Sequence, residues 1–365
     1  MPEPTVAPRR RLSRRKRLVF ALVPLALLCL VGELAVRAWR SRQGFAPFLG
    51  GSYRDLRIDL IRRSYPAAHD PLLGYVPRPG FASADNQWHA QVTIDADGMR
   101  QNGAPRPAGA WLLAAGDSFT FGDQVGDAET WPARLEQELA RPVRNGGVFG
   151  YSFAQSVLRA QRMLAAQTAT DLVLSFIPDD LLRCEESRRF TAIPWFDLRG
   201  GELVLRGVPV PDSAVDNELD SQRLRVLLGH SALVDVLAGN LAPSWWVAQR
   251  PVVRVHPPGT GVAIATKLLD QLVPDCRARG VRLLLVLQGH WPDAGSQQVL
   301  AHARTLGAAT LDLCARFLAV AERTPTVQQQ WFAGHMTAAG NAWAAREIAA
   351  ALVPPTTAGR QTAAR

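Results

Sequence analysis

Cysteine is scarce in this chain: 4 of its 365 residues are cysteine, and one of them, Cys29, lies inside a long apolar run. The other three allow at most one intramolecular disulfide. Cysteine, histidine, aspartate and glutamate nowhere cluster at the spacing that metal sites use. A glycine-rich loop of the kind that holds nucleotide phosphates is missing as well. These absences argue against a metal site and a nucleotide site, and we expect no cofactor.

Excess charge is also missing from most of the chain. The net charge is +9, but residues 1–42 carry ten basic and two acidic groups and account for +8 of it. The rest of the chain is nearly neutral, so the high isoelectric point of about 10.2 does not indicate a nucleic-acid partner. We interpret residues 1–17 as a basic cytoplasmic arm that meets anionic lipid headgroups.

A single long apolar run begins at Leu18 and continues past Glu33 to Val36, about nineteen residues, which is close to the length that spans a bilayer. Seven basic residues precede the run and three follow it, which favours a cytoplasmic N-terminus. No small-x-small cleavage site follows the run. We therefore expect residues 18–38 to be an uncleaved signal anchor in a bacterial inner membrane, with the C-terminal domain in the periplasm. A cleaved signal peptide is the alternative.

Beyond the anchor, apolar strands alternate with helical patterns. The expected strands are 111–115, 143–145, 171–177, 281–287 and 309–313. The expected helices are 131–140, 153–166, 261–279, 297–306 and 338–352. This alternation predicts a three-layer, doubly wound α/β domain with a parallel sheet. We place that domain at 70–354, after a stalk or lead-in at 39–69 and before a disordered tail at 355–365.

Residues 181–258 interrupt the alternation. Gly200 and Gly201 supply the turn of an expected hairpin, and an apolar stretch predicts a helix over 224–237. Because this insertion leaves the sheet just after the strand 171–177, it emerges beside the carboxyl edge of the sheet. It serves either as a cap that selects substrate or as a packing elaboration.

Ser118 stands just beyond the expected strand 111–115, in the turn Gly116-Asp117-Ser118. Ligands in parallel α/β folds gather beyond the carboxyl ends of the strands. Later the chain reads Asn145-Gly-Gly-Val-Phe-Gly150-Tyr and, near its end, Gly334-His335-Met-Thr-Ala-Ala-Gly340-Asn. In order and spacing these motifs resemble the SGNH/GDSL esterase family. The resemblance implies the same three-layer fold.

The resemblance also implies roles for single residues. Ser118 corresponds to the nucleophile and His335 to the general base. The family's oxyanion hole uses the backbone N–H of the serine, the backbone N–H of a glycine, here Gly150, and an asparagine side chain. Asp179 stands at the asparagine position, where an ionised carboxylate repels an oxyanion instead of donating to it.

A second departure concerns the acid that orients the histidine in this family. It lies two or three residues upstream of the histidine, where this chain has Ala333 and Phe332. Two explanations remain open. Ser118 and His335 work as a dyad, with a backbone carbonyl or a distant acid such as Asp312 holding the imidazole, or the site is degenerate.

His290 and Trp291 follow the expected strand 281–287 and so point to the same edge of the sheet. We interpret them as substrate contacts. One histidine without neighbouring ligands does not indicate a metal ion.

Two functions of different classes fit these residues. The first is a membrane-anchored periplasmic ester hydrolase or O-acyltransferase that acts through an acyl-serine on an acylated envelope glycan or another ester. The second is a degenerate domain of the same fold that binds a glycan or a partner. The sequence does not predict the oligomeric state.

Overall fold

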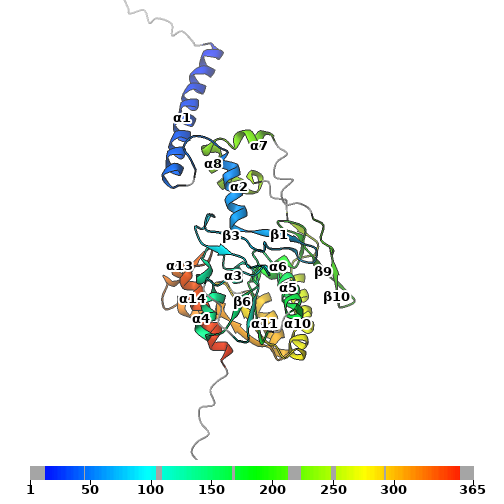
Figure 1. The fold of residues 1–365 in the computed structure, drawn as a ribbon. Helices are drawn as coiled ribbons and strands as arrows, with labels where there is room; N and C mark the ends of the chain where they lie inside the picture. The colour runs from blue at the N-terminus through cyan, green and yellow to red at the C-terminus, as the bar shows by residue number, and fades with distance from the viewer. Residues whose placement is uncertain are drawn as a thin grey trace, which may run out of the picture. The chain divides into compact units, whose positions relative to one another are not determined.

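The computed structural model describes residues 13–44, 46–103, 109–166, 169–212, 223–247, 252–291 and 293–353. These residues form two compact units. The larger unit holds the described residues of 60–212 and 252–353, and the smaller unit holds those of 13–59 and 223–247 (Figure 1). The expected tail at 355–365 and residues 1–12 of the basic arm lie outside the described residues.

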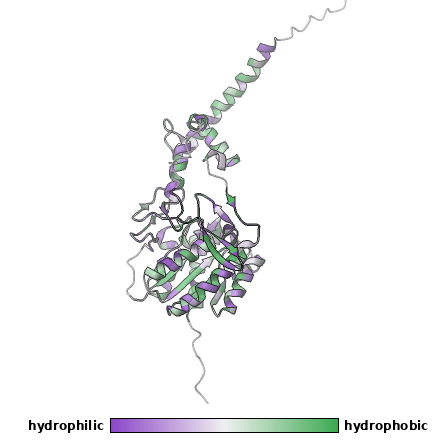
Figure 2. Cartoon of the chain, turned by 90° about the vertical axis from the view of Figure 1, so that its right-hand side faces the viewer, coloured by the Kyte–Doolittle hydropathy of each residue, from purple (hydrophilic) through white to green (hydrophobic). Residues whose placement is uncertain are grey.

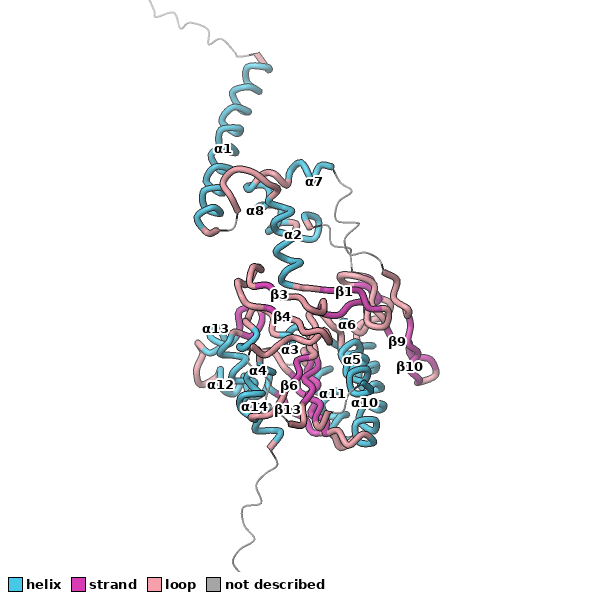
Figure 3. The backbone as a smooth tube through the Cα atoms, in the orientation of Figure 1, coloured by secondary structure: helices cyan, strands magenta, loops and turns pink. Residues whose placement is uncertain are grey.

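A five-stranded parallel sheet forms the centre of the larger unit, in the order β13-β12-β7-β5-β6. Its strands are β5 (Leu112–Ala115), β6 (Val143–Asn145), β7 (Asp171–Phe176), β12 (Arg282–Leu287) and β13 (Ala309–Asp312). All five lie within a residue or two of the expected positions, so the predicted α/β fold class is confirmed. Figure 3 shows these strands in magenta between helices in cyan.

Helices cover both faces of this sheet because successive residues of each strand point to opposite sides. In β5, Leu113 and Ala115 pack into one apolar core, and Leu112 and Ala114 pack into another. The first core is covered by α5 (Phe153–Ala166), α10 (Thr260–Ala278) and α11 (Ala294–Thr305). The second is covered by α4 (Trp131–Leu139), α12 (Leu313–Ala321) and α14 (Ala338–Leu352), with α13 (Val327–Trp331) beside them.

Short hairpins precede the first sheet strand and are part of the larger unit. They are β1 (Ala67–Asp70) with β2 (Gly74–Pro77) and β3 (Ala82–Ser83) with β4 (Val92–Thr93). A third apolar cluster joins them to the loop that follows β6. The Tyr75 hydroxyl donates to the carbonyl oxygen of Phe149 at 2.8 Å and so fixes that loop from outside the sheet.

The insertion is divided between the two units. Its hairpin forms as predicted, from β9 (Trp195–Arg199) and β10 (Glu202–Arg206), and Gly200 and Gly201 take positive φ in its turn. Short strands β8 (Glu186–Arg188) and β11 (Val253–Arg254) pair at its base. The hairpin belongs to the larger unit, and the helices between residues 223 and 247 belong to the smaller one.

The helical stretch expected over 224–237 is divided in the structure. Two helices occupy this stretch, α7 (Arg223–Leu228) and α8 (Ala232–Leu241), followed by α9 (Pro243–Trp246). Ser231 separates the first two, because its hydroxyl accepts from the backbone N–H of Val234 and so caps the start of α8. A serine cap of this kind begins a helix and does not continue one.

The smaller unit is built around the apolar helix α1 (Arg14–Arg42), with α2 (Tyr53–Ser64) beginning in the segment expected as a stalk. Among the described residues, α1 alone is long and apolar enough to span a bilayer, and Figure 2 shows its predominantly green surface. Asp235 of α8 is fully buried and pairs with Arg40 of α1 and Arg57 of α2. The Trp246 indole also donates to this carboxylate at 2.6 Å.

Candidate active site

Ser118 lies on a tight turn at the carboxyl end of β5. The strand ends at Ala115, and Ser118 begins the one-turn helix α3 (Ser118–Phe121). Gly116 takes φ +156°, and a Cβ there would lie 2.7 Å from the carbonyl oxygen of Ser175, so the strand leaves the sheet at a position that admits only glycine. Asp117 is the N-cap, and its carboxylate accepts from the backbone N–H of Phe119.

Ser118 and His335 lie within hydrogen-bond distance, although 217 positions separate them in the sequence. The Ser118 Oγ is 2.9 Å from the His335 Nε2. His335 belongs to β15 (His335–Met336), which pairs with β14 (Phe332–Ala333) just before α14. Burial lowers the pKa of His335 below its ordinary value, against the opposing charge of Asp117. A neutral imidazole beside a serine hydroxyl is the arrangement that general-base catalysis needs.

Asp123 is a site residue that the sequence analysis missed. Its Oδ2 lies 3.6 Å from the His335 Nε2, its Oδ1 has no hydrogen-bond partner among the described residues, and only 2% of the residue is exposed. Burial raises the pKa of Asp123 well above its ordinary value, against the positive charge of Arg100. Gly122 ends α3 at φ +88° and returns the chain toward the serine, where the backbone N–H of Asp123 donates to the Ser118 carbonyl oxygen at 3.1 Å.

Asp312, the distant acid considered from the sequence, is engaged elsewhere. It caps α12 by accepting from the backbone N–H of Ala315, and its other oxygen accepts from the Gln297 amide at 2.7 Å. No contact joins it to His335 among the described residues. The nearest carboxylate to the imidazole thus comes from the nucleophile's own turn.

Two backbone donors are available for an oxyanion. Within the described part of the chain, neither the N–H of Ser118 nor that of Gly150 has a hydrogen-bond acceptor. The loop that carries Gly150 packs on the serine turn, since the N–H of Val148 donates to the Gly116 carbonyl oxygen at 3.0 Å. Gly150 takes φ +70°, and a Cβ there would lie 2.6 Å from the Phe190 ring.

Asp179, at the position of the family's asparagine, lies on α6 (Pro178–Arg183) and is exposed to solvent. The adjacent Asp180 is fully buried instead and accepts from the backbone N–H of Ile177 at 3.1 Å. Of the two neighbouring acids in α6, Asp179 is thus exposed to solvent and Asp180 is buried.

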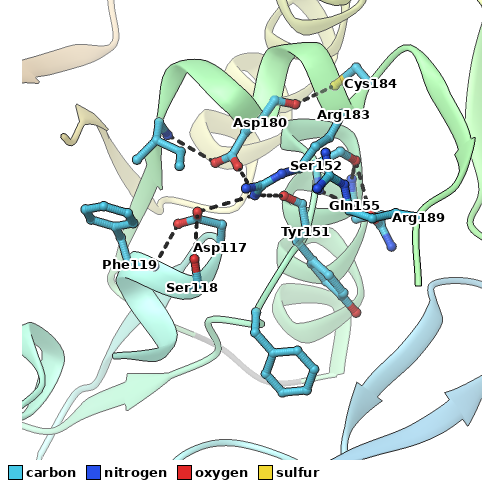
Figure 4. A network of polar contacts seen from close by, with 12 residues as sticks. Asp117, Ser118, Phe119, Tyr151, Ser152, Gln155, Asp180, Arg183, Cys184 and Arg189 are labelled. Carbon is cyan, nitrogen blue, oxygen red and sulfur yellow. Dashed lines mark hydrogen bonds and ion pairs between the residues drawn. The ribbon is translucent and has the colours of Figure 1, made fainter. Parts of the chain in front are cut away.

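Arg183 links that buried acid to the serine turn (Figure 4). Its Nη1 lies 2.6 Å from the Asp180 Oδ1, 2.9 Å from the Tyr151 carbonyl oxygen and 3.5 Å from the Asp117 Oδ2. The neighbouring carboxylates Asp180 and Asp117 raise the pKa of Arg183 despite its burial. The Arg183 guanidinium thus pairs with the carboxylate of Asp117, whose Oδ2 is 3.2 Å from the Ser118 Oγ.

His290 and Trp291 lie in an aromatic cluster beside the serine and histidine. The Trp291 ring is 6.5 Å from that of Phe119, and the Phe119 ring is 5.1 Å from that of His335. His290 contacts Trp291 at 4.4 Å and Phe332 at 4.7 Å between ring centroids. Both residues thus belong to a cluster of rings that includes His335, and their contact with substrate stays a prediction. In the described ranges no three metal-ligating side chains come together.

Comparison with known proteins gives matches among solved structures alone. No protein-family model matches the chain, and no curated protein matches it. A lipase/acylhydrolase from Enterococcus faecalis is 10% identical, with 66% of this chain and 94% of that chain covered at a TM-score of 0.38. An acetylxylan esterase from Geobacillus stearothermophilus is 14% identical, with 66% and 93% covered at 0.37. The function is therefore inferred from the sequence motifs and from the geometry of Ser118 and His335.

Proposed function

We propose that this protein is a serine-dependent ester hydrolase or O-acyltransferase of the SGNH type. The observation that carries the proposal is the 2.9 Å contact between the Ser118 Oγ and the His335 Nε2 at the carboxyl end of a central strand. The N–H groups of Ser118 and Gly150, which have no acceptor among the described residues, supply the second requirement, donors for a developing oxyanion.

The reaction follows from these groups. As the Ser118 oxygen attacks the acyl carbon, its proton moves to the His335 Nε2, and the carbonyl oxygen becomes an oxyanion that the two N–H groups stabilise. The ester C–O bond then breaks, and the proton on Nε2 passes to the departing alkoxide. Water, or a sugar hydroxyl in a transferase, then attacks the acyl carbon and gives its proton to Nε2. The bond between the acyl carbon and the Ser118 oxygen breaks, and the proton on Nε2 returns to that oxygen.

Asp123 stabilises the imidazolium in this scheme. It contacts the same nitrogen that receives the serine proton, so its role is electrostatic and differs from the usual support of Nδ1. Opposite charges about 4 Å apart attract by about 4 kcal/mol at an effective dielectric near 20. Only the ionised form of Asp123 supplies this attraction, and its raised pKa moves ionisation to higher pH.

We further propose that α1 is retained as a membrane anchor and that the larger unit is periplasmic. The support is that the C-terminal third of α1 is part of a folded unit. The Glu33 carboxylate accepts from the backbone N–H groups of Ala232 and Leu233, and Arg40 pairs with the buried Asp235. Removal of α1 as a signal peptide would take Arg40 away from the buried Asp235 and leave Arg57 as its only arginine partner among the described residues. The loss of one partner of a buried ion pair strongly destabilises the folded state. Intact-mass measurement of the protein purified from a bacterial host tests this directly. We expect a mass that includes α1, and a mass that lacks α1 would contradict the proposal.

This location favours an acylated envelope glycan as the substrate, with other esters as the alternative. A degenerate domain that binds a glycan or a partner remains the second candidate. The observations that favour it are the exposed Asp179, the Phe332 and Ala333 positions, and the burial that holds Asp123 toward its neutral form.

Hydrolysis of p-nitrophenyl acetate by the full chain in detergent separates these candidates. A small acyl group is appropriate because Ser118 is only 4% exposed. We expect activity in the wild type, background rates in Ser118→Ala and His335→Ala, and wild-type rates in Ser156→Ala, a buried serine on α5 outside the site. Equal background rates in all four proteins would rule out simple ester hydrolysis.

A further inference from the structure

Helix α7 is inverted relative to a helix on the surface of a soluble protein. One of its two arginines is inside: Arg225 is 7% exposed and donates to the carbonyl oxygen of Trp245 at 2.6 Å. Its aliphatic residues are outside: Leu224 is 59% exposed and Leu227 is 71% exposed. A surface helix usually buries its apolar stripe and exposes its charges. The exposed apolar face of α7, formed by Leu224 and Leu227, therefore calls for an apolar partner.

The junction between α7 and α8 lies where the apolar run of α1 ends. The His230 carbonyl oxygen accepts from Arg37 at 2.8 Å, and the Leu233 N–H donates to Glu33 at 2.9 Å. A Cβ on Gly32 would lie 3.3 Å from the Leu233 side chain, so the two helices are in direct contact at that level. Figure 1 shows α8 beside the end of α1 that is farther from the N-terminus.

Side chains typical of a membrane interface surround this level. Trp39 on the last turns of α1 is 57% exposed, and Arg42 and Arg223 are exposed as well. Tryptophan favours the headgroup region of a bilayer, and arginine there meets lipid phosphates. The apolar face of α7 thus adjoins an aromatic and basic belt on the helix expected to cross the membrane.

We propose that α7 lies in the headgroup–acyl boundary of the same bilayer that α1 spans, with Leu224 and Leu227 inserted among the lipid chains. This inference rests on the proposed anchoring of α1. It makes the smaller unit a membrane-embedded collar, defined here as α7 and the start of α8 around residues 32–40 of α1. The occupant of the exposed face is lipid, because α7 ends two residues before His230, and residues 230–233 contact α1 at Glu33 and Arg37.

Spin labelling of the full chain in nanodiscs with anionic lipid tests the collar. Three single-site samples are compared: the wild type labelled at Cys29, and Leu227→Cys and Asp55→Cys, each combined with Cys29→Ser. The remaining three cysteines are buried, and Asp55 has a side chain that is 70% exposed in the same unit. The readout is collision of the nitroxide with oxygen, which concentrates in lipid, and with a water-soluble nickel chelate.

We expect labels at Cys29 and Leu227→Cys to collide several-fold more with oxygen than with nickel, and the label at Asp55→Cys to show the reverse. A lipid-like Cys29 with a water-like Leu227→Cys would overturn the collar and leave the anchor intact. Low collision with both reagents at Leu227→Cys would overturn it in favour of a second copy of the chain. A water-like Cys29 would show that the anchor itself is wrong, and the collar with it.

Discussion

At the scale of residues, the site is dominated by the balance of buried charges around one serine. Asp117 uses one oxygen to cap α3 and the other to contact the Ser118 hydroxyl. The guanidinium of Arg183 pairs with the Asp117 carboxylate. Asp123 contacts the imidazole at Nε2, the nitrogen that also contacts Ser118, and among the described residues no arginine is in direct contact with Asp123. Asp117 thus holds the Ser118 hydroxyl in place, and in the proposed mechanism Asp123 stabilises the His335 imidazolium that forms when the hydroxyl loses its proton.

Replacement of Asp123 by asparagine tests the second of these acids. We expect kcat to fall by about tenfold to a hundredfold with KM nearly unchanged. This loss is smaller than the full attraction of about 4 kcal/mol because the raised pKa leaves Asp123 only partly ionised. The pH profile gives a second readout. Because burial lowers the pKa of His335, its base form appears at lower pH than for an ordinary histidine, and activity rises there.

Ionisation of Asp123, whose pKa is raised, should add a further rise at higher pH in the wild type. Asp123→Asn should lack that second rise while it keeps the first. Identical profiles of kcat/KM for the two proteins would show that Asp123 has a structural role alone.

Asp179 offers a complementary substitution, because Asp179→Asn introduces the amide that the resemblance to the SGNH/GDSL family implies at this position. We expect kcat to rise severalfold, and a full oxyanion-hole donor is worth about a hundredfold or more. Asp179→Ala is the control, since it removes the charge without adding a donor. Equal increases in both variants would assign the effect to charge, and no increase in either would place Asp179 outside the oxyanion hole.

At the scale of elements, the sheet and its helices could be read from the sequence, and the acid beside the histidine could not. Each strand of the sheet is a short apolar run that ends in polar or glycine-rich residues, so its position follows from local pattern. The partnership of Asp123 with His335 depends on how the α3 turn folds back at Gly122 and where β15 lies. That relation joins distant segments and has no periodic signal. The division at Ser231 was missed because the apolar residues on either side suggested one continuous helix.

The loop that carries Gly150 gives a prediction at this scale. A Cβ on Gly147 would clash with the backbone nitrogen of Phe121 in the serine turn, whereas Gly126 has ordinary φ and a Cβ there would meet only the Glu129 side chain. We expect Gly147→Ala to lower the free energy of unfolding by about 1–3 kcal/mol and to reduce kcat. Gly126→Ala should do neither. Chemical denaturation and kinetics of both variants measure this, and a fully active Gly147→Ala would contradict the close packing of loop and turn.

At the scale of the whole molecule, the chain combines two compact units. The larger unit holds every residue proposed for chemistry, and the smaller unit combines α1 with the helices between residues 223 and 247. The smaller unit depends on Asp235, a fully buried carboxylate that Arg57, the Trp246 indole and Arg40 hold at a lowered pKa despite its burial. One buried acid therefore joins its own helix, α8, to three other helices of the smaller unit.

Asp235→Ala should destabilise the smaller unit by about 3–5 kcal/mol, because it leaves Arg40 and Arg57 without their buried partner. Limited proteolysis of the full chain should then cleave within residues 223–247, while Asp55→Ala, at an exposed carboxylate, should resist as the wild type does. Ester hydrolysis by the larger unit should persist in both variants. Unchanged protection in Asp235→Ala would show that the ion pairs do not hold this unit together.

The central claim is that His335 activates Ser118 as a nucleophile. Labelling of the full chain with a fluorophosphonate, followed by mass mapping of the adduct, tests it most directly, because the probe needs no knowledge of the natural substrate. We predict an adduct on Ser118 in the wild type and its loss in His335→Ala. An unlabelled Ser118 in the wild type, or equal labelling of the two proteins, would contradict the account.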